Sequence, residues 1–438
     1  MSGVSHRIDR VEATFDNPNL VPNAGLVLAG TLMVRLGLEA LVNTWVRTGS
    51  ALPGRKVLTL VSAMLAGASH IDHVDILRAG ATAEVLPHRV MAPSTIGTFL
   101  RTFTFGHVRQ LDAVLSRALG RAWNLGAGLS SGEAIIVDLD STICEVYGKQ
   151  KQGASYGYTK KLGYHPLLAT LAGTGEIVMS RMRKGSANTA RGAVRFVNEL
   201  LAVIRHAGAD GSLTVRADSG FWSWKLVDRL NTHGVKWSIT VRNIPAVHAA
   251  ISRIPDTAWV EIGYTDSGKA QVAFTTYTSG RGPKQRVVRL VVRRTRLTDP
   301  AQRALWPDWR HHCFITNIAD DVVTIDAFHR RHATVELAIK DLKEGAGLEH
   351  VPSGHYHANA AWLSCVVLAH NLSTWVHTLS NQHTPITNRT RRRRFFGLCA
   401  TLVNKSGQMT LRFPLDWPWE NEFSIALTAL RALPQRSG

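Results

Sequence analysis

The sequence predicts an α/β protein with a mixed β-sheet, preceded by a helical region and interrupted by a β-rich insertion. Three observations predict this class. Residues 24–130 repeat apolar side chains at helical spacing. From residue 131, short apolar runs alternate with amphipathic segments, as in a sheet that carries helices. Residues 243–310 contain short strand-like runs separated by Gly, Pro and Ser, which is typical of a β-rich insertion.

Residues 1–130 are expected to form a helical, DNA-binding region. The segments AGLVLAGTLMVRLGLEALVNTWV and RKVLTLVSAMLAGA have helical apolar spacing, and Pro93 and Ser94 mark the start of a further helix in PSTIGTFLRTF. A small cluster with a short second helix resembles a helix-turn-helix DNA reader. Plain helical packing is the alternative, because no side chain here identifies itself as a base reader.

Residues 131–242 are expected to form the first part of the α/β core. Three strands are predicted in EAIIVDLD, HPLLATLA and GEIVMSRMR, the last two joined by a turn at Gly173–Gly175. An amphipathic helix follows and ends at Gly208. Two more strands, SLTVRADSG and VKWSITVR, flank a second helix that ends at Gly234. Antiparallel strands followed by strands that alternate with helices indicate a mixed sheet.

The rest of the chain is expected to complete this core. After the insertion at 243–310, the segment HHCFITNI predicts that a core strand resumes within residues 311–380. A long helix is predicted from Thr324 to Lys343, and the apolar segment ANAAWLSCVVLAHNLSTWVHTL predicts a buried one. Residues 381–438 form a basic C-terminal segment, in which Arg391–Arg394 can either grip DNA or be a disordered basic run.

Charge is the strongest global feature of the chain. Its 438 residues include 51 lysines and arginines against 32 acids, a formal net charge of +19. A field of that sign attracts polyanions, and nucleic acid is the usual partner. An anionic membrane is the rival, but no basic amphipathic helix, lipidation signal or long apolar run supports it. Four cysteines without CxxC spacing suit a reducing cytoplasm, and no P-loop or GxSxG motif is present.

Two acids stand at the end of the first predicted strand, in AIIVDLDST. Because side chains alternate along a strand, Asp138 and Asp140 point to the same face. Buried acids are rare unless they are paired or bind a metal. From these residues alone, acids that cap the next turn are an equally good explanation.

Three acids together favour a metal site. Asp140 ends the first strand, Asp218 ends the fourth, and Glu336 is on the predicted long helix. Carboxylates at two strand ends and on a facing helix can meet at one edge of a sheet. Hard cations such as Mg²⁺ take oxygen ligands of this kind, and two such ions promote attack on a phosphodiester.

The helix that carries Glu336 has an unusual face. His329, His332, Glu336, Lys340 and Lys343 are spaced so that they share it. Such a face suits an acid that holds a metal while its neighbours bind phosphates; a solvent-exposed face with one Glu–Lys pair is the alternative. A loop contains four further lysines that alternate with tyrosines: Lys149, Lys151, Lys160 and Lys161. Such a loop suits phosphate contact and base stacking, and an ordinary surface loop is the alternative.

These residues resemble the DDE transposases of bacterial insertion sequences, which have an RNase H-like, retroviral integrase-like fold. DLDST is similar to the family's first-aspartate motif, with Asp140 and Thr142 in place, and VRADSGF is similar to its second, with Asp218. The family's Tyr-x2-Arg-x3-Glu-x6-Lys signature is matched at Glu336 and Lys343, with His329 and His332 at its first two positions. The segment GKQKQGASYGYTKKLGYHPLLA resembles the group typified by insertion sequence thirteen-eighty. The resemblance covers roughly residues 90–380.

The resemblance implies a cut-and-paste DNA transposase in which Asp140, Asp218 and Glu336 hold two Mg²⁺ or Mn²⁺ ions. It also implies double-stranded DNA as substrate, a homodimer on DNA and a hairpin intermediate during excision. Asp140 is preferred as the first aspartate because Ser-Thr follows it, and Asp138 is the alternative. Two other functions stay open: a catalytically inactive, domesticated DNA-binding protein, and an RNase H-like nuclease without strand transfer.

Overall fold

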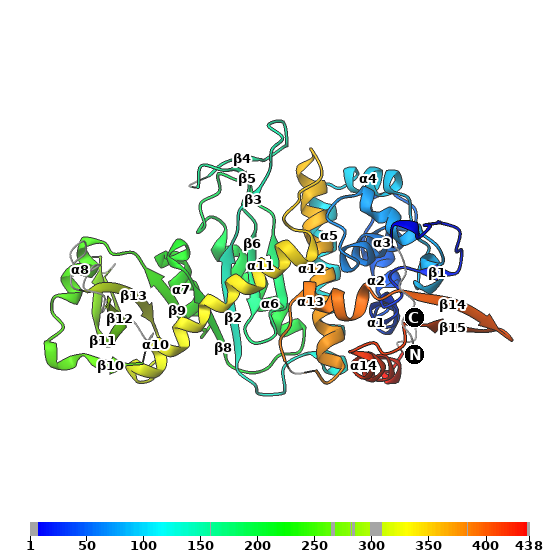
Figure 1. Ribbon diagram of the computed structural model, residues 1–438. Coiled ribbons are helices and arrows are strands. Elements are labelled where there is room, and N and C mark those ends of the chain that lie inside the picture. Colours follow the sequence, from blue (N-terminus) through cyan, green and yellow to red (C-terminus); the bar gives the residue numbers. More distant parts are fainter. Residues whose placement is uncertain are drawn as a thin grey trace.

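The computed structural model describes residues 8–157, 159–263, 268–280, 282, 285–297, 309–382 and 384–435. It is a mixed α/β protein with three parts in a row (Figure 1). A large sheet lies in the middle, the β-rich insertion extends it on one side, and the helical region lies on the other.

The centre of the sheet has the mixed strand directions that the sequence predicts. Strand β2 (Ile135–Ser141) pairs in antiparallel fashion with β6 (Leu167–Leu171), which pairs with β7 (Ile177–Arg181) in the same way. On its other side β2 is parallel to β8 (Leu213–Ala217), which is parallel to β9 (Lys236–Val241). The carboxyl ends of β2 and β8 therefore lie at the same edge of the sheet.

The insertion continues the same sheet. Its strands are β10 (Val260–Ile262), β11 (Gly268–Ser279) and β12 (Arg286–Leu297), and the core strand β13 (Arg310–Thr316) follows them; each is antiparallel to its neighbours. Strand β13, predicted from HHCFITNI, pairs with β9, so nine strands form one sheet. The strands β11 and β12 each have 12 residues and are longer than the short strands that the sequence predicts, because they pair with each other along their whole length.

The expected long helix after β13 is broken. It consists of α10 (Val322–Arg330), a 3-10 turn (Arg331–Ala333) and α11 (Thr334–Ala346), and the three cross the sheet in front in Figure 1. Two shorter helices, α6 (Ala193–His206) and α7 (Trp224–Thr232), connect the core strands, and α8 (Pro245–Ile251) lies against the insertion. Apolar periodicity did not reveal the break, because the turn has only three residues and none of them is buried.

The helical region packs around one buried helix. α12 (Tyr356–Leu379) is buried along most of its length, as its apolar sequence predicts. It contacts α1 (Leu26–Arg35), α3 (Pro53–Leu65), α4 (Pro93–Arg101) and α5 (Phe105–Ala122), while α2 (Leu38–Trp45) packs on α3 and α5. In the described residues, no single helix is long and apolar enough to cross a membrane; the pair α1 and α2 meets that test only jointly and is bent by 58°.

The C-terminal segment packs on the helical region. It contains α13 (Asn388–Arg391), a hairpin of β14 (Ala400–Lys405) and β15 (Gln408–Arg412), and α14 (Glu420–Ala432). β14 also pairs with β1 (Leu20–Val21), so the two ends of the chain are joined. Arg391 is buried and Arg392 donates to the carbonyls of Met64 and Leu65. Part of the arginine run is therefore structural rather than disordered.

Candidate functional site

The register of β2 and β8 places the acids in two layers. Asp138 is paired with Arg216 across the parallel strands, and Leu139 with Ala217. The next residues, Asp140 and Asp218, therefore follow side by side, toward the edge where both strands end. We call Asp138, Arg216 and His332 the deep layer, and Asp140, Asp218 and Glu336 the edge layer.

The deep layer is a closed ion-pair cluster. Asp138 is 1% exposed. Its two oxygens accept hydrogen bonds from Nε and Nη2 of Arg216, each at 2.7 Å, and Oδ1 also lies 2.7 Å from Nδ1 of His332. Nη1 of Arg216 donates to the carbonyl of Phe328 at 2.8 Å. Asp138 thus ties β2 to β8 and both strands to the α10–α11 segment, and both of its carboxylate oxygens are engaged.

The edge layer has acids with few partners. Oδ1 of Asp140 accepts a hydrogen bond from the Ser141 amide at 2.6 Å, and Oδ1 of Asp218 accepts one from the Gly220 amide at 3.0 Å. Burial raises the pKa of Asp140 to about 6, and the nearby charges of Asp218 and Glu336 act in the same direction. The three carboxylates therefore lie close enough to repel one another. Glu336 is exposed in the first turn of α11.

The donor set fits divalent cations. Three carboxylates that repel one another and accept mainly amide hydrogen bonds are the oxygen ligands that Mg²⁺ and Mn²⁺ take. In the parts of the chain that are described, however, no three His, Cys, Asp or Glu side chains converge closely enough to ligate a single ion. The edge layer gathers the acids in one place without bringing them into a finished coordination sphere.

The two histidines of the helix face lie inside the protein. His329 contacts Oγ of Ser238 at 2.5 Å and Oγ1 of Thr240 at 3.0 Å, and its ring stacks on Phe314. Burial lowers the pKa of His329 to about 3, so it is neutral at pH 7. His332 is turned toward Asp138. The expected phosphate contacts of both histidines are therefore not supported by their positions, because helical spacing shows which residues share a face but not whether that face is covered.

The two lysines of the same face lie farther along α11. Lys340 is exposed and lies 4.0 Å from Glu344. Nζ of Lys343 donates to the carbonyl of Ile143, just after β2, at 2.9 Å. Lys343 also lines a cavity of about 500 Å³, together with Lys161 and Glu145. Lys343 is thus near the edge where β2 ends.

The lysine loop is partly ordered by a small sheet. β5 (Leu162–Tyr164) pairs with both β3 (Cys144–Glu145) and β4 (Ser155–Tyr156). Lys149 and Lys160 are exposed. Lys161 forms an ion pair with Glu145 at 2.7 Å, and Lys151 donates to the carbonyl of Val351. Of these four predicted DNA contacts, Lys149 and Lys160 are exposed and have no such bond among the residues that the structure describes.

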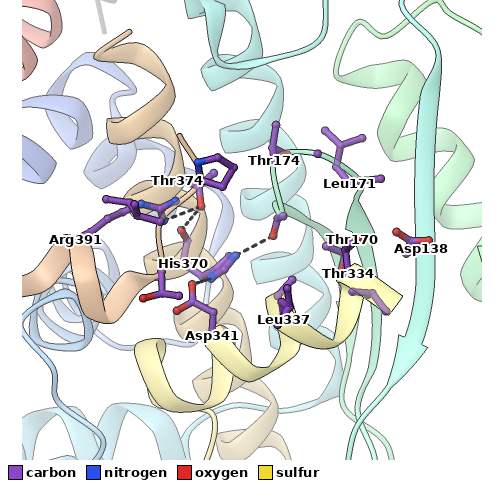
Figure 2. A pocket seen from close by; sticks show the side chains of 18 residues that line it. Asp138, Thr170, Leu171, Thr174, Thr334, Leu337, Asp341, His370, Thr374 and Arg391 are labelled. Carbon is purple, nitrogen blue, oxygen red and sulfur yellow. Dashed lines mark hydrogen bonds and ion pairs between the residues drawn. The ribbon is translucent and has the colours of Figure 1, made fainter. Parts of the chain in front are cut away.

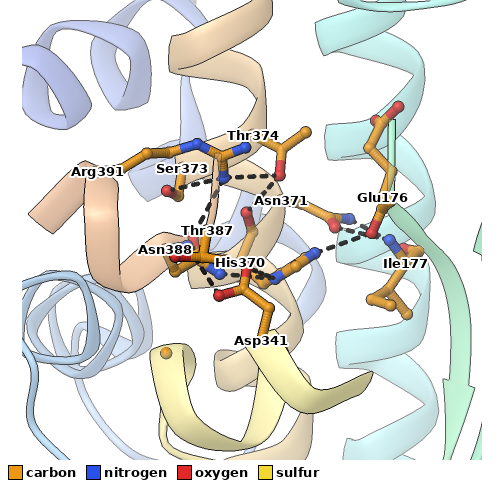
Figure 3. A network of polar contacts seen from close by, with 12 residues as sticks. Glu176, Ile177, Asp341, His370, Asn371, Ser373, Thr374, Thr387, Asn388 and Arg391 are labelled. Atoms are coloured by element: carbon orange, nitrogen blue, oxygen red, sulfur yellow. Dashed lines mark hydrogen bonds and ion pairs between the residues drawn. The ribbon is translucent and has the colours of Figure 1, made fainter. Parts of the chain in front are cut away.

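A polar network that includes Asp341 holds α11 one turn and more beyond Glu336. Oδ1 of Asp341 accepts a hydrogen bond from the Asn388 amide at 2.8 Å, and Nδ2 of Asn388 lies 2.8 Å from Nδ1 of His370 (Figure 3). Nε2 of His370 in turn contacts the carbonyl of Gly175 at 2.9 Å. The network thus links α11 to α12, α13 and the turn between β6 and β7. Beside it lies a cavity of about 360 Å³, lined by Leu337 and Thr170 among others (Figure 2).

Sequence reasoning missed two residues of the site. Arg216 was detectable: aligning the predicted parallel strands on Asp140 and Asp218 places this single cation opposite Asp138. His165 is fully buried, and its Nε2 lies 2.9 Å from Oγ of Ser141. Burial lowers the pKa of His165, and the nearby charge of Asp218 acts in the opposite direction. Nothing in the sequence around His165 indicated that position, since it depends on the pairing of β2 with β6.

A mixed sheet with neighbouring aspartates at two parallel strand ends, and a glutamate on the helix that crosses them, is an arrangement for metal-assisted phosphoryl transfer. Residues 5–435 match the family described as transposase DDE domain, group 1. The chain therefore belongs to this family of transposase domains, and its membership supports DNA transposase function.

A solved structure also resembles the chain. It is the cryo-EM structure of a piggyBac transposase synaptic complex with hairpin DNA. The two share 12% sequence identity with a TM-score of 0.46, over 86% of this chain and 80% of that one. None of the curated proteins matches the sequence.

Proposed function

We propose that the protein is the DNA transposase of a bacterial insertion sequence, of the group typified by insertion sequence thirteen-eighty, and that it moves its element by cut-and-paste transposition. The observation that carries this proposal is the edge layer, in which Asp140 and Asp218 end neighbouring parallel strands beside Glu336. The strand order β7-β6-β2-β8-β9, with three antiparallel strands followed by two parallel ones, supports an RNase H-like core.

Asp140, Asp218 and Glu336 would hold two Mg²⁺ or Mn²⁺ ions. Bound ions of this kind lower the pKa of water and neutralise the charge that develops on a phosphodiester. The chain contributes the positioning: the amides of Ser141 and Gly220 orient Asp140 and Asp218. The deep layer holds α11 on the sheet, which fixes the side from which Glu336 approaches.

DNA is the proposed substrate and partner. The net charge of +19 favours association with a polyanion. Lys343 lies beside the end of β2, and Lys340, Lys149 and Lys160 are exposed; we propose all four as contacts to the DNA backbone. Joining two transposon ends requires two sites, so we propose a homodimer on DNA. A protein with this task would act in the bacterial cytoplasm, on the nucleoid.

The test is cleavage of DNA that carries the element's own ends. Wild type should cut in Mg²⁺ or Mn²⁺ and should join the cut ends to a target duplex, while Asp140→Asn, Asp218→Asn and Glu336→Gln should bind the ends without cutting. Removing the metal with EDTA should stop cleavage and leave binding. Cleavage without joined products would indicate a nuclease without strand transfer. Binding without cleavage by wild type would indicate a DNA-binding protein.

A further inference from the structure

A basic cavity of about 350 Å³ opens at the same sheet edge as the carboxylates. Ser141, next to Asp140 on β2, is paired with Leu167 at the start of β6, and Leu167 is paired with Arg181 at the end of β7. Leu167 and Arg181 both line the cavity. Because neighbouring strands are about 4.8 Å apart, the cavity lies one or two strands from Asp140 along the edge, on the face to which Ser141 rather than Asp140 points.

Cations outnumber acids around this cavity. It is lined by Arg183, Lys184, Arg191 and Arg195 in addition to Arg181. The acids beside it are already engaged: Glu199 pairs with Arg109, Arg181 and Arg195, and Asp112 pairs with Arg109. The cavity therefore carries a net positive charge that the described residues do not neutralise.

Arg183 is the buried cation of the cavity, and backbone carbonyls fix its position. It is only 8% exposed. Its Nε donates to the carbonyl of His165 at 2.9 Å, and its Nη1 donates to the carbonyls of Asn188, Thr189 and Arg191 at 3.2, 2.9 and 3.2 Å. Its Nη2 is buried and has no hydrogen-bond partner among the described residues. A buried guanidinium without a carboxylate is costly and suits an anion that would complete it.

A helix N-terminus also faces the cavity. α6 begins at Ala193, and its N-cap residue, Gly192, lines the cavity and supplies no side-chain cap. The free amides and the dipole of a helix N-terminus attract negative charge. The segment just before α6 also contacts the carboxylate site. Thr189 packs so closely on Gly220 that a Cβ added to Gly220 would lie 2.8 Å from Cγ2 of Thr189. Gly220 is the residue whose amide orients Asp218.

We propose that this cavity binds a backbone phosphate of the DNA strand that lies at the edge layer. The inference rests on the proposed function and names a contact that this function leaves open. DNA is favoured over a free phosphate because Arg191 and Arg195 are exposed outside the buried Arg183 and extend the positive charge beyond one anion. A DNA strand that crosses this edge of the sheet can contact both the carboxylates and this surface.

The experiment compares Arg191→Ala/Arg195→Ala with wild type and with a matched control, Lys405→Ala/Arg412→Ala, on the distant β14–β15 hairpin. Affinity for a duplex with the element's end is measured over a salt series, with thermal unfolding to check the fold. Each lost phosphate contact lowers the salt slope by about 0.9, so the cavity variant should lose about 1–2 units and the control none. A scan with single methylphosphonates should find a position that weakens wild type but not the cavity variant.

An unchanged salt slope and an unchanged methylphosphonate profile in the cavity variant would overturn the proposal. Inorganic pyrophosphate provides the second arm: if it raises the Tm of wild type but not of the cavity variant, while DNA binding is equal in both, the cavity takes a free phosphate instead. Both measurements report binding alone. Failure of the proposed function, seen as no cleavage by wild type, is therefore distinguishable from failure of this inference.

Discussion

The deep layer and the edge layer are built from the same two strands and the same α10–α11 segment, on the same face of the sheet, yet their electrostatics are opposite. In the deep layer, Asp138 forms an ion pair with Arg216 and contacts the ring of His332. One step toward the edge, burial raises the pKa of Asp140 to about 6, and the charges of Asp218 and Glu336 act in the same direction. The difference teaches that a pair of acids at i and i+2 cannot be assigned from spacing. What decides their roles is the residue opposite each one on the next strand.

The largest effect should come from the edge layer. Asp140→Asn should lower DNA cleavage by about 10³-fold or more, because a ligand of the proposed metal site is lost. Its free energy of unfolding should stay equal or rise slightly, since a repelling charge is removed. Single-turnover cleavage and urea unfolding measure the two quantities. Cleavage at the wild-type rate would assign the acid a structural role and remove the distinction between the layers.

The deep layer should behave in the opposite way. Asp138→Ala should lower the free energy of unfolding by about 3–5 kcal/mol, because it leaves the buried Arg216 without its carboxylate. Asp140→Ala is the matched control and should change it by less than about 1 kcal/mol. The double variant Asp138→Leu/Arg216→Met should be more stable than Asp138→Ala, since apolar side chains then replace both charges. Equal stability of the two single variants would contradict the assignment.

The pH dependence of stability tests a further residue next to the deep layer, His329, whose ring stacks near that of His332. The pKa of His329 is lowered by burial to about 3, so the folded protein prefers the neutral ring. Stability from this group is complete above pH 6.5 and falls as the pH drops toward 3, because the unfolded chain takes up the proton first. One proton accounts for about 1.4 kcal/mol per pH unit. His329→Gln should therefore show a shallower loss of stability between pH 6 and 4, whereas exposed His233→Gln should show the wild-type slope.

The smallest effect should come from the lysines beyond the edge layer. Lys340→Ala should lower the salt slope of DNA binding by about 1 and leave stability unchanged, because this side chain is exposed. Lys343→Ala should also cost about 1 kcal/mol of stability, since its bond to the Ile143 carbonyl is lost. Identical salt slopes for wild type and Lys340→Ala would exclude that lysine as a DNA contact.

The sequence predicts the strands and the acids better than the burial of their neighbours. β2, β8 and their terminal aspartates follow from apolar runs that end in acids. The break between α10 and α11 does not, because Arg331–Ala333 is a three-residue turn without a buried side chain that could mark it. The positions of His329 and His332 were also beyond reach, since they depend on partners on β9 and β2, distant in sequence. Pairing between strands, rather than local pattern, carries that information.

The unbroken sheet has a mechanical consequence. β12 pairs with β13 from Arg289 to Thr295, and β13 pairs with β9, so the insertion is joined to the core by continuous strand pairing rather than by a flexible linker. Neighbouring strands are about 4.8 Å apart, and five such steps separate β8 from β10, so about 24 Å of sheet joins Asp218 to the outer edge of the insertion. Anything bound at that edge would be held at a set distance from the carboxylates. The insertion therefore acts as a rigid spacer between its outer edge and the carboxylates.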